Sequence, residues 1–429
     1  MRVLVVGRGA REHALCWRLS GDREVDRVFA APGNAGTAHC ADNVSIQPND
    51  ISALLAFSKQ KAIDLVVVGP EAPLVGGLVD RLEGEGIAAF GPRQQVAELE
   101  GSKVFAKEFM SRHGIPTAPF RVFDDADEAS HFIEEAGRPL VVKAEGLAAG
   151  KGVFVASSVH EAREAVDRIM RHRDFGAAGN RIVIEERLQG QEVSYHVVSD
   201  GKKFVTLAPA QDHKRLLEGD EGPNTGGMGA YSPPSVVDAA VERRIQHEIV
   251  EPTLAGLAQE GRPFRGALFV GLMVHEGAPR VLEYNVRFGD PECTCIMARW
   301  KGSVLPLLLG AAQGDLSGVC AEWEAPCALS VVLASQGYPA PHARGMPIAG
   351  LERARLMEPE VVVFHAGTKV DHAAVHTAGG RVLTVTGIGD TMDAAAKRAY
   401  GVVAGLHFEG MQFRRDIGLR ARPSDASYT

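Results

Sequence analysis

The chain has 429 residues, too many for one ordinary hydrophobic core, and this length predicts about two to four domains. Hydrophobic residues make up 45% of it and charged residues 23%, as in a folded, soluble protein. With 46 basic against 54 acidic side chains, the net charge of −8 argues against a polynucleotide-binding surface. Small anionic ligands remain compatible with this charge, because a few lysines and backbone amides can hold a phosphate locally.

Cysteine usage and the N-terminal sequence both indicate a cytoplasmic protein. Six cysteines occur without a C-x-x-C pair, and a chain of this size does not depend on disulfides, so we expect reduced thiols. The apolar run at the start is interrupted by Arg8 and Arg11 and is too short for a signal peptide. No stretch approaches the roughly 20 apolar residues of a membrane span. We expect no membrane partner, and a monomer or weak homo-oligomer.

The first hundred residues alternate short apolar runs with helical patterns. Apolar runs at 2–7, 64–68 and 87–90 each end at glycine or Gly-Pro, and a helical pattern covers 12–19. This alternation predicts a parallel sheet flanked by helices, with ligands at the carboxyl ends of its strands. Asn34, Gly36, Thr37 and Glu71 fall near such ends, where ordinary turns would use the same residue types.

From about residue 101 the pattern changes, and no internal repeat or low-complexity linker marks a boundary. The polar, glycine-dense segment 211–233 is too long for a simple turn. We expect helices at 102–113, 236–260 and 391–406, strands at 139–144, 181–185, 266–275, 280–287, 328–334, 361–365 and 381–387, and an alternating stretch at 191–209.

The segment KAEGLAAGKGV, residues 143–153, is the most informative local feature. Strand geometry directs Lys143 away from its neighbours, and the glycines that follow allow backbone amides to approach an anion, with Lys151 adding charge. It is not a Walker A loop, because only three residues separate Gly146 from Gly150 and Gly152 stands where that motif needs Ser or Thr. Phosphate binding and a flexible surface loop both remain open from this segment alone.

The segment VLEYNVRFGDPE, residues 281–292, predicts a metal site. Strand periodicity puts Glu283, Asn285 and Arg287 on one face. A carboxylate and an amide oxygen are hard ligands for Mg²⁺, and the arginine fork suits a carboxylate or phosphate. An edge strand with a solvated polar face would show the same alternation, but the tight Gly-Asp-Pro turn that follows favours function.

Two further polar segments, each next to an apolar run, are candidates for ligand contacts. In IEERLQGQE, residues 184–192, Glu192 is placed to accept hydrogen bonds from ribose hydroxyls, although a hairpin with exposed acids looks the same. In QDHKR, residues 211–215, the alternating charges of Asp212, Lys214 and Arg215 favour a functional loop.

The loop GRGAREH, residues 7–13, begins like a dinucleotide-binding fingerprint. It has Glu12 where the third glycine belongs, so it is weak evidence for NAD. A phosphate at the start of the following helix remains physically plausible. His13 is expected to be a helix residue without a catalytic role.

These segments, in this order, closely resemble the phosphoribosylamine–glycine ligase family of the ATP-grasp superfamily. The resemblance runs from GRGAREHA through PGNAGT, VGPEAPL, LEGSKVFAKEFM, GPNTGGMGAYSP and EYNVRFGDPE to HFEGMQFRRDIG near the end. It implies a multidomain fold of α/β and α+β units. The expected parts are an N-terminal α/β domain at 1–102, an ATP-grasp domain at 103–320 with a mobile lid at about 118–190, and a small C-terminal domain at 321–429.

The resemblance also implies the reaction. Glycine is joined to 5-phosphoribosylamine in de novo purine biosynthesis, with ATP as co-substrate and Mg²⁺ or Mn²⁺ as the metal. Glycyl phosphate and ADP form first, and the amine then displaces phosphate. Such chemistry needs alignment and charge neutralisation and no protein nucleophile, which agrees with the absence of a G-x-S-x-G motif from the sequence.

Matching positions carry the family's roles over to individual residues. Lys143, Arg287 and Asp212 are expected to be catalytic, and Glu283 and Asn285 to hold the metal. The expected nucleotide contacts are Lys103, Lys143, Gly150, Lys151, Gly152, Glu185, Glu186, Leu188 and Glu192. The expected contacts with glycine and phosphoribosylamine are Gly9, Asn34, Gly36, Thr37, Glu71, Lys214 and Asp290.

Four residues depart from the family's pattern. Ala10 stands where a second glycine is usual, Glu145 where aspartate is typical, and Cys293 and Cys295 where Thr-Gln or similar residues are commoner. These changes bear on substrate affinity more than on reaction type. Three alternatives stay open. They are another carboxylate–amine ligase of the ATP-grasp type, a nicotinamide-binding oxidoreductase or sensor, based on the first glycine loop, and a catalytically silent, regulatory paralogue, based on Cys293 and Cys295.

Overall fold

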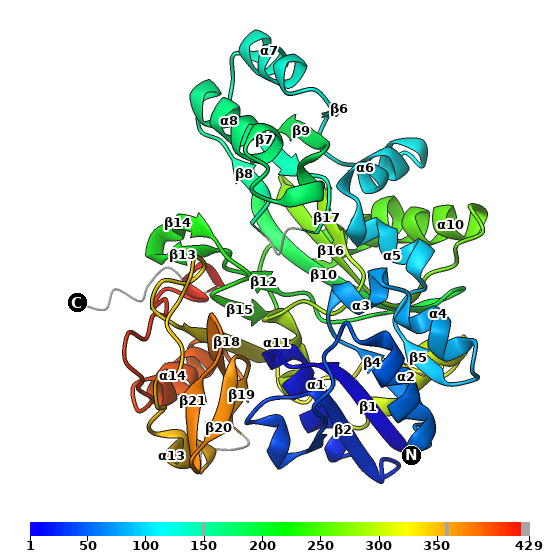
Figure 1. Cartoon of the computed structure of the whole chain (residues 1–429), viewed down its shortest axis with the longest axis vertical. Coiled ribbons are helices and arrows are strands. Elements are labelled where there is room, and N and C mark those ends of the chain that lie inside the picture. The colour runs from blue at the N-terminus through cyan, green and yellow to red at the C-terminus, as the bar shows by residue number, and fades with distance from the viewer. Residues whose placement is uncertain (148–150, 357–359, 422–429) are drawn as a thin grey trace.

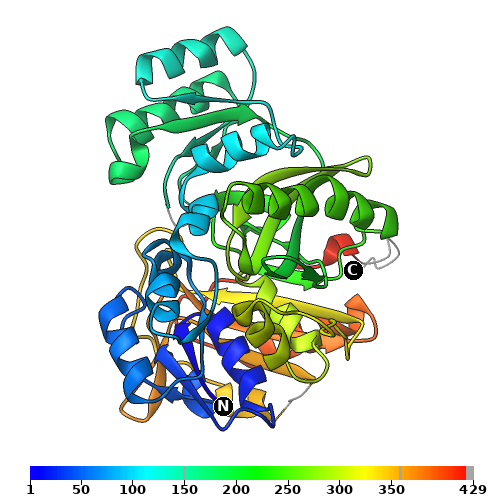
Figure 2. The same cartoon turned by 90° about the vertical axis from the view of Figure 1, so that its right-hand side faces the viewer.

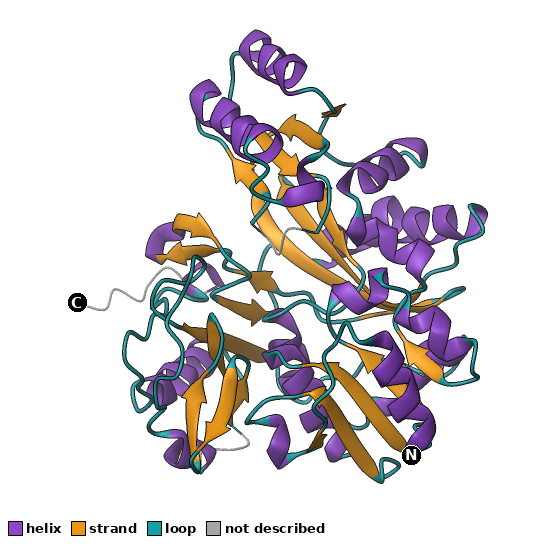
Figure 3. Cartoon of the chain, viewed as in Figure 1, coloured by secondary structure: helices purple, strands orange, loops and turns teal. Residues whose placement is uncertain are grey.

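The computed structural model describes residues 1–147, 151–356 and 360–421. The N-terminal and C-terminal parts of the chain lie side by side, and a small sheet with two covering helices, α7 and α8, projects at one end of the molecule (Figures 1 and 2). Figure 3 shows that strands run through every part of this arrangement, with helices on their outer faces. No helix in the described ranges is long and apolar enough to cross a membrane.

The N-terminal part contains the predicted parallel sheet, in the strand order β3-β2-β1-β4-β5. Its central strands are runs of valine and leucine buried on both faces, because helices cover each side. The strands are β1 (Arg2–Gly7), β2 (Arg27–Pro32), β3 (Asp42–Asn43), β4 (Leu65–Val68) and β5 (Ala88–Phe90), and the helices are α1 (Ala10–Ser20), η1 (Thr37–His39), α2 (Ile51–Gln60), α3 (Glu71–Val75), α4 (Leu78–Glu83) and α5 (Gln94–Gly101).

The strand order reverses at β1, so the loops after β1 and β4 open a crevice at the carboxyl edge of the sheet. The Glu12 side chain fills the base of this crevice and accepts a hydrogen bond from the Gly9 amide. A Cβ atom added to Gly69 would lie 2.1 Å from Glu12 Oε1, and one added to Gly7 would lie 2.5 Å from Glu12 Cδ. These glycines therefore make room for the Glu12 carboxylate. This carboxylate lies at the start of α1, where a dinucleotide-binding protein would hold the pyrophosphate, and its negative charge argues against a nicotinamide cofactor.

Two antiparallel sheets form the middle of the chain. The projecting sheet has the order β6-β9-β7-β8, and the larger one has the order β11-β10-β16-β17. The expected helix at 236–260 forms as two α-helices joined by a π-helical turn. The elements are α6 (Lys103–Arg112), β6 (Phe120–Phe123), α7 (Ala126–Ala136), β7 (Leu140–Ala144), β8 (Val153–Val155), α8 (Val159–Val166), η2 (Asp167–Arg171), η3 (Gly176–Gly179), β9 (Ile182–Glu186), β10 (Gln191–Asp200), β11 (Phe204–Thr206), α9 (Ala239–Ile245), η5 (Gln246–Val250), α10 (Glu251–Gln259), β16 (Arg265–His275) and β17 (Ala278–Asn285).

The third large sheet combines strands from distant parts of the sequence, in the order β12-β15-β18-β22-β19. Its first two strands come from the segment 211–233, and β15 pairs with β18 of the C-terminal part. The elements are β12 (Gln211–Asp212), β13 (Arg215–Leu217), η4 (Glu218–Asp220), β14 (Glu221–Asn224), β15 (Gly229–Ser232), α11 (Glu292–Arg299), α12 (Leu305–Gln313), β18 (Cys327–Ala334), α13 (Leu351–Arg355), β19 (Val361–His365), β20 (Thr368–Asp371), β21 (Ala374–Thr377), β22 (Arg381–Gly389), α14 (Met392–Val403) and η6 (Leu419–Ala421).

A buried polar contact joins the two ends of the chain. The Asn34 amide donates to the carbonyl of His365 at 2.8 Å, and the His365 backbone N–H donates to Nδ1 of His13 at 2.8 Å. Burial lowers the pKa of His13 well below its ordinary value, so the ring is a neutral acceptor. His13 therefore has a structural role here, as expected from its place in the helix.

Replacing Gly69 by alanine should lower the free energy of unfolding by about 1–3 kcal/mol, because the new methyl group overlaps the Glu12 carboxylate. Denaturant unfolding measures the loss, and Gly401→Ala is the control, since a Cβ at Gly401 meets open space. In the background Glu12→Ala the same Gly69→Ala change should cost less. Equal losses in both backgrounds would contradict the role given to Glu12.

Candidate functional site

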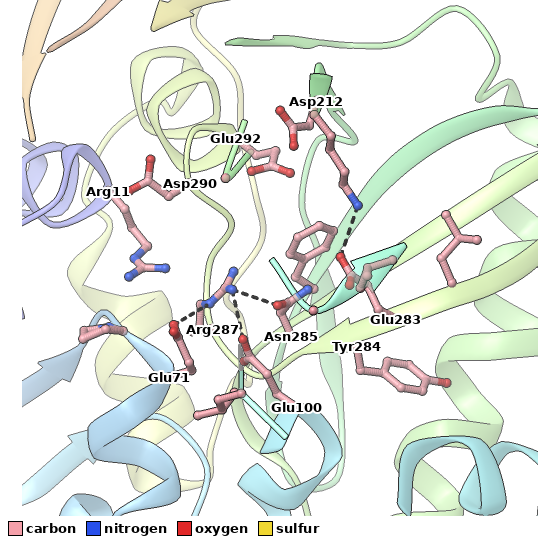
Figure 4. A pocket seen from close by; sticks show the side chains of 18 of the residues that line it. Arg11, Glu71, Glu100, Asp212, Glu283, Tyr284, Asn285, Arg287, Asp290 and Glu292 are labelled. Carbon is pink, nitrogen blue, oxygen red and sulfur yellow. Dashed lines mark hydrogen bonds and ion pairs between the residues drawn. The ribbon is translucent and has the colours of Figure 1, made fainter. Parts of the chain in front are cut away.

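A cavity of about 520 Å³ lies where the three parts of the chain meet. The N-terminal loops contribute Arg11 and Glu71, the middle of the chain contributes Lys143 and Glu283, and the C-terminal part contributes Arg381. Its polar side chains point toward one another from several elements (Figure 4). Charged groups from distant segments are thus concentrated in one space.

Lysines dominate one region of the cavity. Lys143 pairs with the buried carboxylate of Glu185 and donates a hydrogen bond to the carbonyl of Leu282 in β17 at 3.0 Å. Lys107 Nζ lies 2.5 Å from the other oxygen of Glu185, and Lys103 Nζ donates to the carbonyl of Gly146 at 3.0 Å. Two ammonium groups on one carboxylate, with Lys103 lining the same cavity, leave an excess of positive charge, which suits a chain of phosphates.

Burial sets the protonation of these groups. It lowers the pKa of Lys107 to about 8 and lowers that of Lys103, although nearby glutamates oppose the change. Burial also acts to raise the pKa of Glu185, but Lys143 and Lys107 outweigh it and bring the pKa below its ordinary value. The carboxylate is therefore ionised at neutral pH and holds the lysines in place.

Glu283 and Asn285 lie on β17 beside this region. The ammonium of Lys214 lowers the pKa of Glu283 to about 2 and lies 3.2 Å from its Oε1 atom. The Asn285 side-chain oxygen accepts a hydrogen bond from Arg287 Nη2 at 2.8 Å. An ionised carboxylate and an amide oxygen on one strand fit the hard ligand set of Mg²⁺ or Mn²⁺. Among the described residues no group of three or more His, Cys, Asp or Glu side chains could hold a metal ion.

Arg287 is held between two acids. Its Nη2 atom lies 2.9 Å from Glu100 Oε1, and its Nε lies 3.5 Å from Glu71 Oε2. In the described structure this buried Nε makes no hydrogen bond and faces the Glu71 carboxylate. Glu100 also accepts from the backbone N–H of Val286 at 2.7 Å, and burial raises its pKa to about 7. The acids orient the guanidinium without using all of its donors (Figure 4).

Asp212 and Glu292 form an acidic wall across the cavity. Ser194 donates to Glu292 Oε1 at 2.7 Å, whereas Asp212 Oδ1 is buried without a hydrogen-bond partner among the described residues. Burial and the neighbouring Glu292 raise the pKa of Asp212 well above its ordinary value. A ligand ammonium would satisfy these oxygens, and Arg287 is available for a carboxylate. The arrangement can therefore receive both ends of an amino acid.

Most of the predicted site residues border the cavity, but several do not. Asn34, Gly36 and Thr37 bond to one another within their own loop, and Glu192 lies 3.6 Å from Lys214. Gly150 lies outside the described residues, so its expected contact with the nucleotide stays a prediction. The predicted residues that line the cavity are Gly9, Glu71, Lys103, Lys143, Gly152, Asp212, Lys214, Glu283, Asn285, Arg287 and Asp290, whereas Asn34, Gly36, Thr37, Lys151, Glu185, Glu186, Leu188 and Glu192 are not among the lining residues.

Other lining residues received no role from the sequence. Arg11 and Glu292 stood inside quoted motifs, but nothing local marked them as cavity residues. Glu100 contacts Arg287, which is 187 positions away in the sequence, and Arg381 contacts Asp290, which is 91 positions away. A single sequence carries no signal for such contacts.

The four departures from the family's pattern occupy structural positions. Ala10 is buried in the first turn of α1, and Glu145 pairs with Arg181 at 2.5 Å. Cys293 and Cys295 are buried, burial raises the pKa of both thiols, and Cys295 Sγ lies 3.1 Å from Ser330 Oγ. Ala10, Cys293 and Cys295 therefore act in packing and Glu145 in an ion pair, and none of the four is among the residues that line the cavity.

The comparisons with known proteins agree across the whole chain. Three models of the phosphoribosylglycinamide synthetase family match: the N domain at residues 1–100, the ATP-grasp (A) domain at 101–293 and the C domain at 328–420. Phosphoribosylamine–glycine ligases of Vibrio cholerae and Agrobacterium fabrum are each 48% identical, over 98% of this chain and 98% and 99% of their own lengths. The crystal structure of the Thermotoga maritima phosphoribosylamine–glycine ligase superposes with a TM-score of 0.85 at 35% identity, covering 97% of this chain and 100% of that one. A biotin carboxylase from Campylobacter jejuni shares the fold, with a TM-score of 0.73 at 14% identity over 98% and 95% of the two chains.

The raised pKa of Glu100 predicts a pH-dependent contribution to stability. Because its pKa is about 7 in the folded chain against an ordinary 4.5, its stabilising contribution is present below pH 4.5 and lost as the pH rises through 7. Glutamine does not titrate. The free energy of unfolding of Glu100→Gln should therefore rise by roughly 3 kcal/mol, relative to that of the unsubstituted protein, as the pH rises from 4.5 through 7. Denaturant unfolding at several pH values measures this gain, with Glu98→Gln on the same helix as the control. Parallel pH profiles for Glu100→Gln and the unsubstituted protein would contradict the prediction.

Proposed function

The chain belongs to the phosphoribosylamine–glycine ligase family, and we propose that it carries out the family's reaction in the cavity described above through a glycyl phosphate intermediate. ATP drives the ligation of glycine to 5-phosphoribosylamine, which gives glycinamide ribonucleotide, ADP and phosphate in de novo purine biosynthesis. The full-length similarity to ligases with this name supports the activity.

One observation supports the assignment of the cavity more than any other. The lysines near Glu185, the side chains of Glu283 and Asn285, and the guanidinium of Arg287 all border the same space. The reaction requires a terminal phosphate and an amino-acid carboxylate to lie together, and these groups are complementary to both.

The metal assignment rests on the donor chemistry of β17. Glu283 and Asn285 would hold Mg²⁺ or Mn²⁺, which would neutralise charge on the phosphates when bound. Both side chains now bond to cationic groups, Lys214 and Arg287, so their oxygens already lie in positive surroundings. This is consistent with two oxygen ligands that exchange a side-chain cation for a metal ion.

The protein residues position the two reacting groups. Lys143 and Lys103 would bind the phosphates, Arg287 the glycine carboxylate, and Asp212 the glycine ammonium. A carboxylate oxygen attacks the γ-phosphorus while the bond to the bridging oxygen of ADP breaks. The amine of phosphoribosylamine then attacks the acyl carbon, phosphate leaves with its bonding electrons, and the amine loses a proton.

The remaining contacts and features are extensions of this proposal. Glu186 and Leu188 would present backbone groups to adenine from the end of β9, and Glu192 would bind the ribose. A lid would exclude water from the acyl phosphate and so protect it from hydrolysis. We further propose domain boundaries near residues 102 and 320, a lid at about 118–190, a cytoplasmic location, and a monomer or weak homo-oligomer.

An isotope-traced assay tests the function. With labelled glycine, ATP and phosphoribosylamine, label should enter glycinamide ribonucleotide in proportion to ADP release. Omission of any one substrate should abolish product formation. Sustained ADP release without phosphoribosylamine, or label transfer to a different amine, would instead assign the chain to another carboxylate–amine ligation.

Glu283→Gln should keep the fold but weaken metal dependence, because it removes the one charged oxygen ligand proposed for the metal. We expect the Mg²⁺ concentration for half-maximal activity to rise at least about tenfold, the loss of one charge-assisted contact. A magnesium titration at saturating ATP measures this, with the surface glutamate Glu322 replaced by glutamine as the control. An unchanged titration would remove Glu283 from the metal site.

A further inference from the structure

Three arginines in the cavity take no part in the proposed chemistry. Arg8 and Arg11 follow β1, and Arg381 begins β22 near the other end of the chain. Figure 4 shows Arg11 and Asp290 on the far side of Arg287 from Glu283. The cavity therefore has a second group of cationic side chains apart from the lysines near Glu185, and Asp290 lies among them, with its Oδ1 atom 3.5 Å from Arg381 Nη1.

Arg11 is fixed but not saturated. Only 6% of the residue is exposed, its Nε donates to Glu12 Oε1 at 2.6 Å, and its Nη1 donates to the carbonyl of Phe288 at 3.0 Å. Among the described residues Nη2 has no hydrogen-bond acceptor, and the guanidinium points into the cavity (Figure 4). A buried arginine held in this way presents a fixed donor to a ligand.

Arg381 approaches the same region from the C-terminal part. Its Nη1 donates to the backbone carbonyls of Asp290, at 2.6 Å, and of Gly226. A Cβ atom on Gly226 would lie 3.1 Å from the guanidinium carbon, so the glycine leaves room for the side chain. Asp290 also neighbours Gly9, since a Cβ atom there would lie 2.9 Å from Asp290 Oδ2. Asp290 thus lies between the loop after β1 and Arg381.

Arg8 and Glu12 determine how an anion is bound here. Arg8 is exposed, and it pairs with no carboxylate in the part of the chain that the structure describes. The Gly9 amide at the start of α1 is already occupied by Glu12. For an anionic group in this region, the guanidinium groups therefore add side-chain donors to the amides that remain at the start of α1.

We infer that Arg8, Arg11 and Arg381 bind the 5-phosphate of phosphoribosylamine, with Asp290 between them for the ribose hydroxyls. The inference rests on the proposed function. The amine and the phosphate lie at opposite ends of this substrate, so an amine placed at the acyl phosphate beside the lysines requires its own phosphate to lie elsewhere. The arginine fork matches phosphate oxygens, and the N- and C-terminal parts supply the binding site jointly.

Steady-state kinetics with phosphoribosylamine, ATP and glycine varied in turn test this inference. Arg8→Ala and Arg381→Gln should each raise KM for phosphoribosylamine at least about tenfold, with KM for ATP and glycine changed less than about twofold. Arg23→Ala, at an exposed arginine outside the cavity, is the control. Because Arg8 is exposed, its substitution is expected to leave the fold intact, which thermal unfolding verifies.

Inhibition by ribose 5-phosphate and by ribose separates a phosphate contact from a structural role. The substitutions should weaken inhibition by ribose 5-phosphate about tenfold and leave inhibition by ribose unchanged. Equal effects on the two inhibitors, or an unchanged KM for phosphoribosylamine, would overturn the arginine assignment. If the unsubstituted protein makes glycinamide ribonucleotide in the labelled assay, such a failure leaves the proposed function standing, whereas an inactive unsubstituted protein would refute the function itself.

Discussion

The pairing of two buried lysines with a single carboxylate is the constraint on which the site depends. Removing Lys107, Lys143 and Glu185 from water costs several kcal/mol per ion, and their mutual attraction opposes this cost. The hydrogen bond from Lys143 to the carbonyl of Leu282 connects this cluster to β17, which carries Glu283 and Asn285. The projecting sheet, α6 and β17 are therefore held around one uncompensated positive charge, and a phosphate chain is the kind of ligand that neutralises it.

Much of the fold follows from local sequence pattern. Runs of valine and leucine that end at glycine gave the parallel sheet of residues 2–90, because burial on both faces requires continuous apolar strands. The strand that bears Glu283 and Asn285 was also predictable, since its polar residues recur at the period of a strand. Placing Glu283, Asn285 and Lys143 in one cavity needed the family resemblance, because nothing local relates residues so far apart.

What the sequence could not provide is contact between distant segments. The strands β12 and β15 join the C-terminal sheet, and nothing in the pattern of 211–233 indicates that partner. Glu12 illustrates a different difficulty, because the glycines around it resemble a cofactor loop although they accommodate a carboxylate. Asn34 and Thr37 likewise use their polar groups to close their own loop, a use that residue type alone does not reveal.

The contact between His13 and His365 has a consequence for synthesis of the chain. Ribosomes release the N-terminal part first, so α1 emerges long before the strand that ends at His365, and before Arg381. Until then the crevice beside α1 in the nascent polypeptide lacks Arg381, which the C-terminal part supplies to the cavity of the complete chain. Premature termination before β22 would leave the sheet without the strand that joins β18 to β19, so fragments of this kind would lack both a complete core and a complete cavity.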